Sequence, residues 1–362
     1  MQRRQFLKAA GVGLTATAVA SPAIAQPMPE TKWRLTSSFP KSLDTLYGAA
    51  EVFAKAVAEA TDNKFKIQVF AGGEIVPGLQ ALDAAQNGTV EMCHTASYYY
   101  FGKDPTFAFG TAVPFGLNSR MQNAWQFFGG GIDLMNEFYK NYNVHGIPCG
   151  NTGCQMGGWF RKEIKSPADF NGLKMRIGGF AGTVLKKLGA VPQQIAGGDI
   201  YPALEKGTLD ACEWVGPYDD EKLGFHKVAK YYYYPGWWEG GAMLHNFINI
   251  DKWNALTPAY KSIVRTASEM TNTWMQSKYD AGNPAALKRL VGGGAQLRPF
   301  TADTMDACHK ASLELYQETT ATNAAFKKVY DHMVAFRNDQ YLWWQVAEYT
   351  FDTYQIRVRA RG

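Results

Sequence analysis

Four polar residues in apolar, glycine-rich segments are the strongest candidates for chemistry. Gln155, Arg176 and Glu213 each lie in or beside a short apolar run with glycines nearby, and Glu239 follows a pair of tryptophans. Glycine beside a strand is typical of a tight bend or of close backbone approach to something bound. Arginine is well suited to a carboxylate, because two parallel N–H donors match two oxygens. These residue types predict a site for a small organic acid.

The position of Arg176 within its segment favours a binding role. If the segment forms a strand, Met175 and Ile177 share one face and Arg176 takes the other, which allows its guanidinium to face a cleft. A structural salt bridge is the alternative role for such an arginine. The residues by themselves leave both roles open.

The two glutamates are candidates for a cation site. Glu213 and Glu239 each stand beside tryptophan in apolar surroundings, where a buried carboxylate must be neutralised, paired or bound to metal. With the side-chain oxygen of Gln155 they would suit a hard cation such as Na⁺ or Ca²⁺, which prefers oxygen ligands. Pairing of both glutamates with lysines at the surface is the alternative.

Enzyme chemistry has weaker support in the sequence. Cys93 and His94 are adjacent, and neighbouring residues of a strand point to opposite faces, which argues against a nucleophile–base pair. No G-x-S-x-G, Walker loop, CxxC or HExxH motif occurs, and no G-x-G-x-x-G opens a helix after a strand. We therefore expect no enzyme activity.

Aromatic clusters and cysteines complete the candidate residues. Tyrosines fill residues 98–100 and 231–234, and among them Tyr100 is the one we expect to touch a ligand. The chain has five cysteines, so an exported form keeps at least one thiol free unless it pairs between chains. Cys149 and Cys154 are close enough in sequence for a disulfide, which spacing alone does not establish.

Alternating strands and helices position these residues. We predict strands over 33–38, 65–70 and 90–94 and helices over 43–61 and 77–86, which indicates a parallel α/β sheet. Residues 88–94 and 207–213 share the pattern of helix stop, strand and polar residue at the strand's carboxyl end. Ligands of open α/β sheets bind at such ends, so His94 and Thr95 would face Glu213 and Trp214 across a cleft. A chance similarity between the two segments is the alternative.

The last third of the chain reads as helical. We predict one long pattern over 258–291 that breaks at Gly282-Asn283-Pro284, a short extended crossing over 297–300, and helices over 301–325 and 325–355. The final helix has more apolar surface than a small lobe buries. This excess indicates a partner chain, with packing on the parent protein as the alternative.

The first residues read as a targeting segment. Arg3 and Arg4 precede an apolar run over 9–20 and then Ala23-Ile24-Ala25, which predicts a twin-arginine signal peptide cleaved after residue 25. The run is too short for a membrane span, and ordinary secretion remains an alternative to the twin-arginine route. Without residues 1–25, which hold three basic residues and no acidic one, 34 basic and 32 acidic residues leave a net charge of +2. This balance gives no electrostatic basis for binding nucleic acid.

The site segments resemble a known family. They are residues 153–159 (G-C-Q-M-G-G-W), 173–177 (L-K-M-R-I), 210–217 (D-A-C-E-W-V-G-P) and 235–239 (P-G-W-W-E). The mature chain is similar throughout to the extracytoplasmic solute-binding subunits of TRAP transporters, the DctP-like family, and within it to the TakP-type binders of α-keto acids and lactate.

The resemblance implies an α/β periplasmic binding protein fold, with a cleft between two lobes, a long hinge helix and a long C-terminal helix. The implied segments are a signal peptide over 1–25, lobe 1 mainly over 26–150, lobe 2 mainly over 151–250, linking helices and a crossing strand over 251–325, and a dimerising helix over 326–362. It implies a periplasmic protein that forms homodimers and docks on TRAP membrane subunits.

The resemblance also implies roles for single residues. Arg176 matches the arginine that clamps the substrate carboxylate. Gln155, Glu213, the backbone carbonyl of Trp214 and Glu239 match the cation site of the keto-acid branch, with Na⁺ or Ca²⁺ as the ion, and Gln155 also touches the ligand. Pyruvate or another 2-oxo acid is the implied ligand; lactate, a dicarboxylate, or use of the cleft by a periplasmic sensor are the alternatives.

Overall fold

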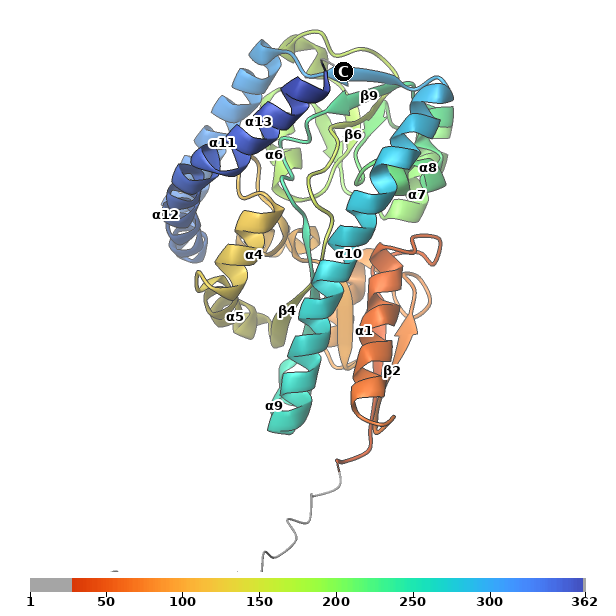
Figure 1. Ribbon diagram of the computed structural model, residues 1–362, viewed down its shortest axis with the longest axis vertical. Helices are drawn as coiled ribbons and strands as arrows, with labels where there is room; N and C mark the ends of the chain where they lie inside the picture. Colours follow the sequence, from red (N-terminus) through yellow and green to blue (C-terminus); the bar gives the residue numbers. More distant parts are fainter. Residues whose placement is uncertain (1–27, 361–362) are drawn as a thin grey trace, which may run out of the picture.

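Two β-sheets organise the chain, in a computed structural model that describes residues 28–360 (Figure 1). The first sheet has the strand order β2-β1-β3-β10-β4 and the second the order β11-β9-β5-β8-β6-β7. We call the first sheet with its surrounding helices lobe 1 and the second lobe 2. The strands are β1 (Thr31–Ser37), β2 (Phe65–Phe70), β3 (Met92–Ala96), β4 (Val144–Asn151), β5 (Gly158–Phe160), β6 (Lys174–Arg176), β7 (Val191–Gln193), β8 (Ala211–Cys212), β9 (Tyr231–Tyr234), β10 (Met243–Asn249) and β11 (Gln296–Pro299).

The sheets are mixed rather than purely parallel. The prediction of parallel strands is confirmed for β1, β2 and β3. It is wrong for β10, which runs antiparallel between β3 and β4. Because β10 returns to lobe 1, the segment 151–250 contributes to both lobes, and the chain crosses between them more than once.

Helices cover both sheets and connect the lobes. Figure 1 shows α10 running along both lobes, with α1 beside it in lobe 1 and α7 and α8 beyond the end of α1 in lobe 2. The α-helices are α1 (Leu46–Ala60), α2 (Ala81–Gln86), α3 (Ala108–Thr111), α4 (Ser119–Phe127), α5 (Gly131–Tyr139), α6 (Gly179–Lys187), α7 (Gly197–Glu205), α8 (Pro217–Leu223), α9 (Ile250–Ala255), α10 (Pro258–Gly292), α11 (Ala302–Thr322), α12 (Ala324–Val346) and α13 (Glu348–Arg359).

The helical spacing of apolar residues explains how α1 packs. Leu46, Ala50, Phe53 and Val57 lie on one face, and all four are buried. Ala50, Phe53 and Val57 join the strands β1 and β2 and the start of α10 in one core cluster of lobe 1. A larger cluster runs through lobe 2 and across the boundary between the lobes.

The expected break in the long helix does not occur, since α10 is continuous over 35 residues through Pro284. Thr257 caps its start, where the hydroxyl accepts from the Tyr260 amide at 3.2 Å, and proline takes the first helical position. Gly282 instead allows close packing, because a Cβ there would lie 2.7 Å from the ring of Tyr218 in α8. At Gly282, α10 therefore packs closely against α8 of lobe 2.

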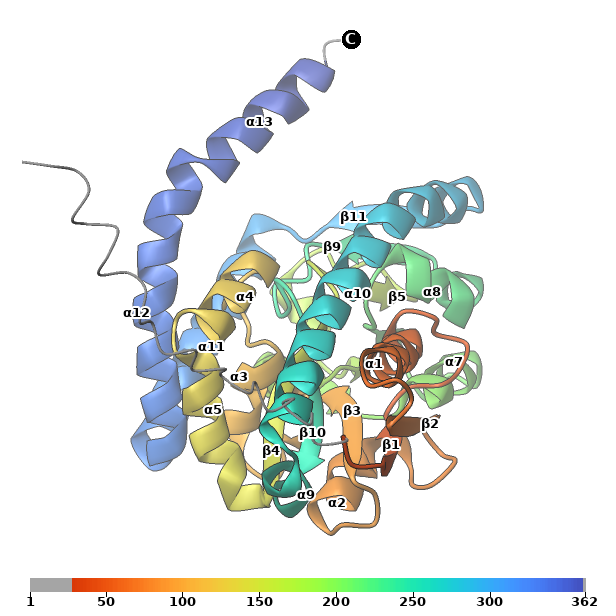
Figure 2. The same cartoon turned by 60° about the horizontal axis from the view of Figure 1, so that its bottom comes forward.

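The C-terminal helix is divided into α12 and α13 at Ala347 and leaves the body of the molecule (Figure 2). None of the α13 residues is buried. Large apolar residues that are between 42% and 70% exposed lie along both helices: Tyr341, Leu342, Trp343, Val346, Tyr349, Phe351, Tyr354, Ile356 and Val358. The predicted signal peptide lies outside the described residues. Within residues 28–360, no helix combines the length and apolarity needed to span a membrane.

Candidate ligand- and cation-binding site

Two adjacent parallel strands place Arg176 and Glu213 side by side. Strand β6 ends at Arg176, and its register pairs Arg176 with Cys212 at the end of β8, so Glu213 follows directly beyond that edge. A Cβ on Gly158 of β5 would lie 2.3 Å from the Cys212 carbonyl oxygen, so this strand can approach β8 only through glycine. The predicted location of a polar residue at the carboxyl end of β8 is confirmed for Glu213.

Arg176 is 1% exposed and is held on one side by protein groups. Its Nη1 forms an ion pair with the Glu213 carboxylate and donates to the Glu213 carbonyl oxygen at 2.9 Å. Its Nε donates to the Ile195 carbonyl oxygen at 3.2 Å, and the guanidinium carbon lies 4.9 Å from the centroid of the Trp214 ring. Of the two roles left open by the sequence, the structure shows the salt bridge, made through Nη1, while the buried Nη2 has no protein partner.

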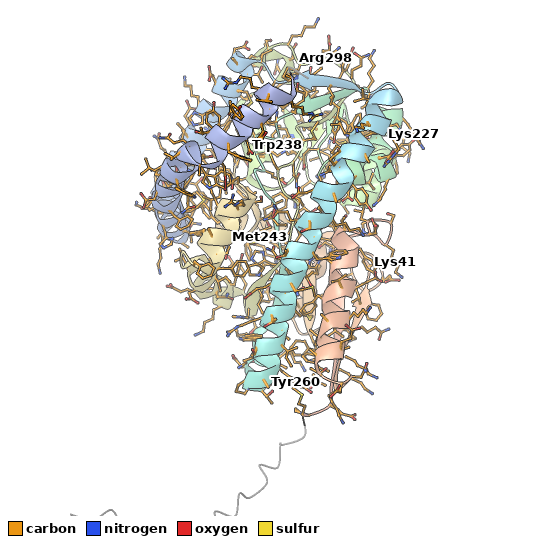
Figure 3. The ribbon with its side chains drawn as sticks, viewed as in Figure 1. Lys41, Lys227, Trp238, Met243, Tyr260 and Arg298 are labelled. Atoms are coloured by element: carbon orange, nitrogen blue, oxygen red, sulfur yellow. The ribbon has the colours of Figure 1, made fainter. Side chains whose placement is uncertain are left out.

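Two loops bring Gln155 and Glu239 to the same place. The Gln155 amide donates to the Glu239 carbonyl oxygen at 3.1 Å, and the Gly236 amide donates to the Gln155 carbonyl oxygen at 3.0 Å. The Gln155 side chain is oriented by its Nε2, which donates to Thr152 Oγ1 at 3.1 Å. Figure 3 marks Trp238 and Met243, which flank this loop, in the middle of the molecule between Arg298 and Tyr260.

Several buried polar atoms in these four side chains have no protein partner. They are one nitrogen, Arg176 Nη2, and four oxygens: Gln155 Oε1, Glu213 Oε2, and Glu239 Oε1 and Oε2. A buried polar atom without a partner costs roughly 1–3 kcal/mol, so a protein keeps such a group where a ligand satisfies it. One free guanidinium donor and four free oxygens suit an anion and a cation bound together.

The electrostatics of the two carboxyls agree with a cation site. Burial raises the pKa of Glu213, and the nearby Arg176 acts in the opposite direction. Burial and then repulsion from Glu213 raise the pKa of Glu239 well above its usual value. Among the described residues no cluster of three His, Cys, Asp or Glu side chains forms, so only a site that includes amide and carbonyl oxygens fits the residues present.

A small cavity lies between the lobes, and of the four polar side chains described above Gln155 lines it. Gln155 and Trp214 line it together with Phe39, Leu46, Ala96, Tyr98, Tyr99, Thr152, Val215, Ala242 and Leu244. The free space between these side chains is small, so only a small ligand could be accommodated between the lobes. Its wall is apolar apart from a few convergent polar groups, as is typical of such sites.

The expectation for Tyr100 is corrected by the structure. Tyr100 does not line the cavity, and its hydroxyl accepts from the Leu82 amide at 2.9 Å and contacts Thr95 Oγ1 at 3.2 Å. Tyr98 and Tyr99 line the cavity instead, with their rings stacked at 5.1 Å. Residues 97–100 form a 3₁₀ turn, in which neighbouring side chains diverge in ways that a strand pattern does not describe.

The other sequence candidates have structural roles in lobe 1. The His94 ring contacts the Cys149 carbonyl oxygen at 3.0 Å, and burial lowers the pKa of His94 to about 4. Cys149 is buried, Cys154 is exposed, and both are free thiols, so the predicted option of a disulfide between them is not realised. Thr95 contacts Ser38 and Tyr100 rather than the cavity.

Comparison with known proteins matches residues 36–323 to the family described as bacterial extracellular solute-binding protein, family 7 (DctP). The monocarboxylate 2-oxoacid-binding periplasmic protein of Nostoc is 49% identical, over 98% of this chain and 99% of its own. A TRAP transporter solute-binding protein of Bordetella bronchiseptica, whose crystals hold a dimer with copurified calcium and picolinate, has 52% identity and a TM-score of 0.91. The alignment covers 92% of this chain and 99% of that one.

A second structure adds a smaller ligand. A TRAP periplasmic solute-binding protein of Pseudoalteromonas atlantica, with sodium and pyruvate bound, has 37% identity and a TM-score of 0.87 over 89% of this chain and 98% of that one. The two lobes, the two sheets and the long C-terminal helices agree with this fold. The chain therefore belongs to the DctP family of TRAP transporter solute-binding proteins.

Proposed function

We propose that this protein captures a small 2-oxo monocarboxylate, such as pyruvate, together with a bridging cation, in the periplasm. It then presents the ligand to the membrane subunits of a TRAP transporter. The observation that carries the proposal is the group of unpaired buried atoms, one arginine nitrogen and four oxygens, beside a small cavity. The 2-oxoacid-binding relative and the sodium- and pyruvate-bound structure support it.

In this proposal Arg176 Nη2 donates to the ligand carboxylate, while Nη1 stays with Glu213. Gln155, Glu213, Glu239 and the Trp214 carbonyl hold the cation through oxygen atoms. A bound cation supplies positive charge that offsets the two carboxylates and attracts the ligand's oxygens. Na⁺ is our first choice for the cation and Ca²⁺ the alternative, since both accept oxygen ligands.

The cavity wall favours a monocarboxylate over a dicarboxylate. Arg176 is the one cationic side chain that we assign to the ligand, and the residues that line the cavity include no lysine or arginine that could pair with a second carboxylate. Phe39, Leu46 and Leu244 would instead contact a short apolar tail. Lactate differs from pyruvate only by a hydroxyl in place of the oxo group, so it remains an alternative ligand of the same site.

The chemistry is capture rather than catalysis. Ligand contacts made by both lobes favour the state in which the lobes meet, which is a shift of population. A periplasmic sensor that uses the same cleft is the alternative role, and it would need no membrane subunits.

We also propose a homodimer that forms through α12 and α13. Their exposed apolar side chains are too numerous for a surface in water, and a second copy offers the same apolar helices. The dimeric relative from Bordetella bronchiseptica supports this arrangement.

Tryptophan fluorescence tests the ligand class directly, because Trp214 lines the cavity. Purified protein in a sodium buffer is titrated with pyruvate, 2-oxobutyrate, lactate and succinate. We expect saturable changes with the two 2-oxo acids at concentrations far below those of succinate. Tighter binding of succinate would contradict the proposal.

A further inference from the structure

The lobes also meet at a second place, outside the ligand cavity, where the start of α1 contacts the first turn of α8. Thr45 Oγ1 donates to Asp219 Oδ1 at 2.8 Å, and the Tyr279 hydroxyl of α10 donates to Asp219 Oδ2 at 2.6 Å. All three side chains are buried. Thr45 belongs to lobe 1 and Asp219 to lobe 2, so their bond exists only while the lobes are together.

Asp44 extends this contact at the surface. Its carboxylate pairs with Lys222 of α8 and, at 2.8 Å, with Lys278 of α10, and it accepts from the Tyr218 hydroxyl at 3.0 Å. Burial raises the pKa of Asp44 but is outweighed by these three donors, which lower it to about 2. Lys41, shortly before Asp44 in the chain, lies at the end of α1 nearer lobe 2 (Figure 3).

The same turn of α8 is connected to the ligand site. Asp220 accepts from the Val215 amide at 3.3 Å, from Trp159 Nε1 at 3.0 Å and from the Tyr232 hydroxyl at 2.7 Å. Val215 lines the ligand cavity, directly after Glu213 and Trp214. Asp219, which contacts Thr45 of lobe 1, is therefore the chain neighbour of Asp220, which binds the backbone amide of Val215 in the cavity wall.

We propose that Asp44, Thr45 and Asp219 form a closure latch, a set of positioning residues that slows ligand release by stabilising the closed form. The inference rests on the proposed function, since it assumes that closure traps the ligand. None of the three residues lines the cavity. The Thr45–Asp219 and Asp44–Lys222 contacts contribute to the closed state alone, because opening returns the partners of each contact to separate lobes.

Thr45→Val and Asp44→Asn test the latch, with Glu74→Gln as the matched control. Valine keeps the shape of threonine, and the Thr45 hydroxyl makes no capping bond to α1, so the helix keeps its start. Glu74 also pairs with a lysine, Lys41, and changes net charge equally, but both partners of that pair lie in lobe 1.

Stopped-flow release of pyruvate, followed by tryptophan fluorescence, gives the first readout. We expect Thr45→Val to release pyruvate roughly tenfold faster, because it removes a bond to a buried carboxylate. Asp44→Asn should release it about threefold faster, as expected for a half-exposed ion pair, and Glu74→Gln should match the parent protein. Release rates of both latch variants within twofold of the control would overturn the latch.

A second readout needs no ligand. Spin labels at Lys55 of lobe 1 and Lys165 of lobe 2, both exposed, report the distance between the lobes in a Cys154→Ser background. We expect Thr45→Val and Asp44→Asn to shift the ligand-free distribution to longer distances. If the parent protein binds no pyruvate, the proposed function fails while this measurement still decides the latch; distributions identical to the control would refute it.

Discussion

Replacement of Arg176 by lysine separates the two tasks that we propose for this side chain, which are compensation of Glu213 and binding of the ligand carboxylate. Lysine keeps a positive charge beside Glu213, so the buried carboxylate stays compensated. It loses the second nitrogen of the guanidinium fork, which is the buried Nη2 without a partner. Arg176→Lys should therefore weaken ligand binding much more than it weakens the fold.

The size of the effect follows from the bonds that change. A hydrogen bond to a charged group contributes about 1.5–3 kcal/mol, which corresponds to a dissociation constant roughly tenfold to 150-fold higher. Calorimetric titration with pyruvate at a fixed sodium concentration measures this change. Arg176→Met should behave differently, since it leaves Glu213 buried without its partner and costs about 3–5 kcal/mol of stability.

Arg298→Lys is the control for the substitution itself. Arg298, on β11, pairs with Glu163 and does not line the cavity, so pyruvate binding should remain unchanged. The reasoning would be refuted if Arg176→Lys bound pyruvate within twofold of the parent protein while its thermal midpoint also stayed unchanged.

Three further predictions address the cation, pH and assembly. Glu239→Gln removes one charged oxygen, so titrations at several sodium concentrations should show about tenfold weaker binding and a flatter sodium dependence; an unaltered dependence would make Glu239 structural. Burial, followed by Arg265 and Lys261, lowers the pKa of His145 to about 4 from 6.5. The unfolded chain therefore binds a proton there first, and the free energy of unfolding falls as pH drops from 6.5 towards 4, by up to ~3 kcal/mol. His145→Phe, which keeps the stacking on Trp253, should flatten this part of the slope in denaturant titrations, and equal slopes would contradict the assignment. Ile356→Asp on α13 should convert the proposed dimer to monomer in light scattering, whereas a dimer of unchanged stability would place the interface elsewhere.

The spacing of apolar residues predicted much of lobe 1, because each spacing corresponds to the buried face of one helix or strand. The spacing of Leu46, Phe53 and Val57 fixed the face of α1, and alternation in residues 65–70 matched β2 within its bounds. Local sequence patterns gave no indication of where the chain crosses between the lobes. Strand β10 joins lobe 1 from the end of the segment predicted for lobe 2. Gly282 and Pro284 read as a break, although α10 continues through them and Tyr218 packs against Gly282.

The part of the candidate site that lies on predicted strands could be predicted from the sequence. The strand patterns placed Arg176 in a strand and Glu213 at a strand end, but not their direct ion pair, because that pair depends on the register between β6 and β8. Tyr98 and Tyr99 were missed in favour of Tyr100 because a 3₁₀ turn sets their directions. The latch was also missed, since Asp44 and Asp219 lie far apart in sequence and neither stands in a recognisable motif.

Calorimetric titration of the metal-stripped protein with pyruvate, with and without Na⁺ or Ca²⁺, tests the central claim most directly. Coupled capture of anion and cation predicts tight binding with a cation present and binding that is weaker by at least an order of magnitude without one. Equal pyruvate affinity in the presence and absence of every cation tested would contradict the account and would leave Glu213 and Glu239 as structural residues.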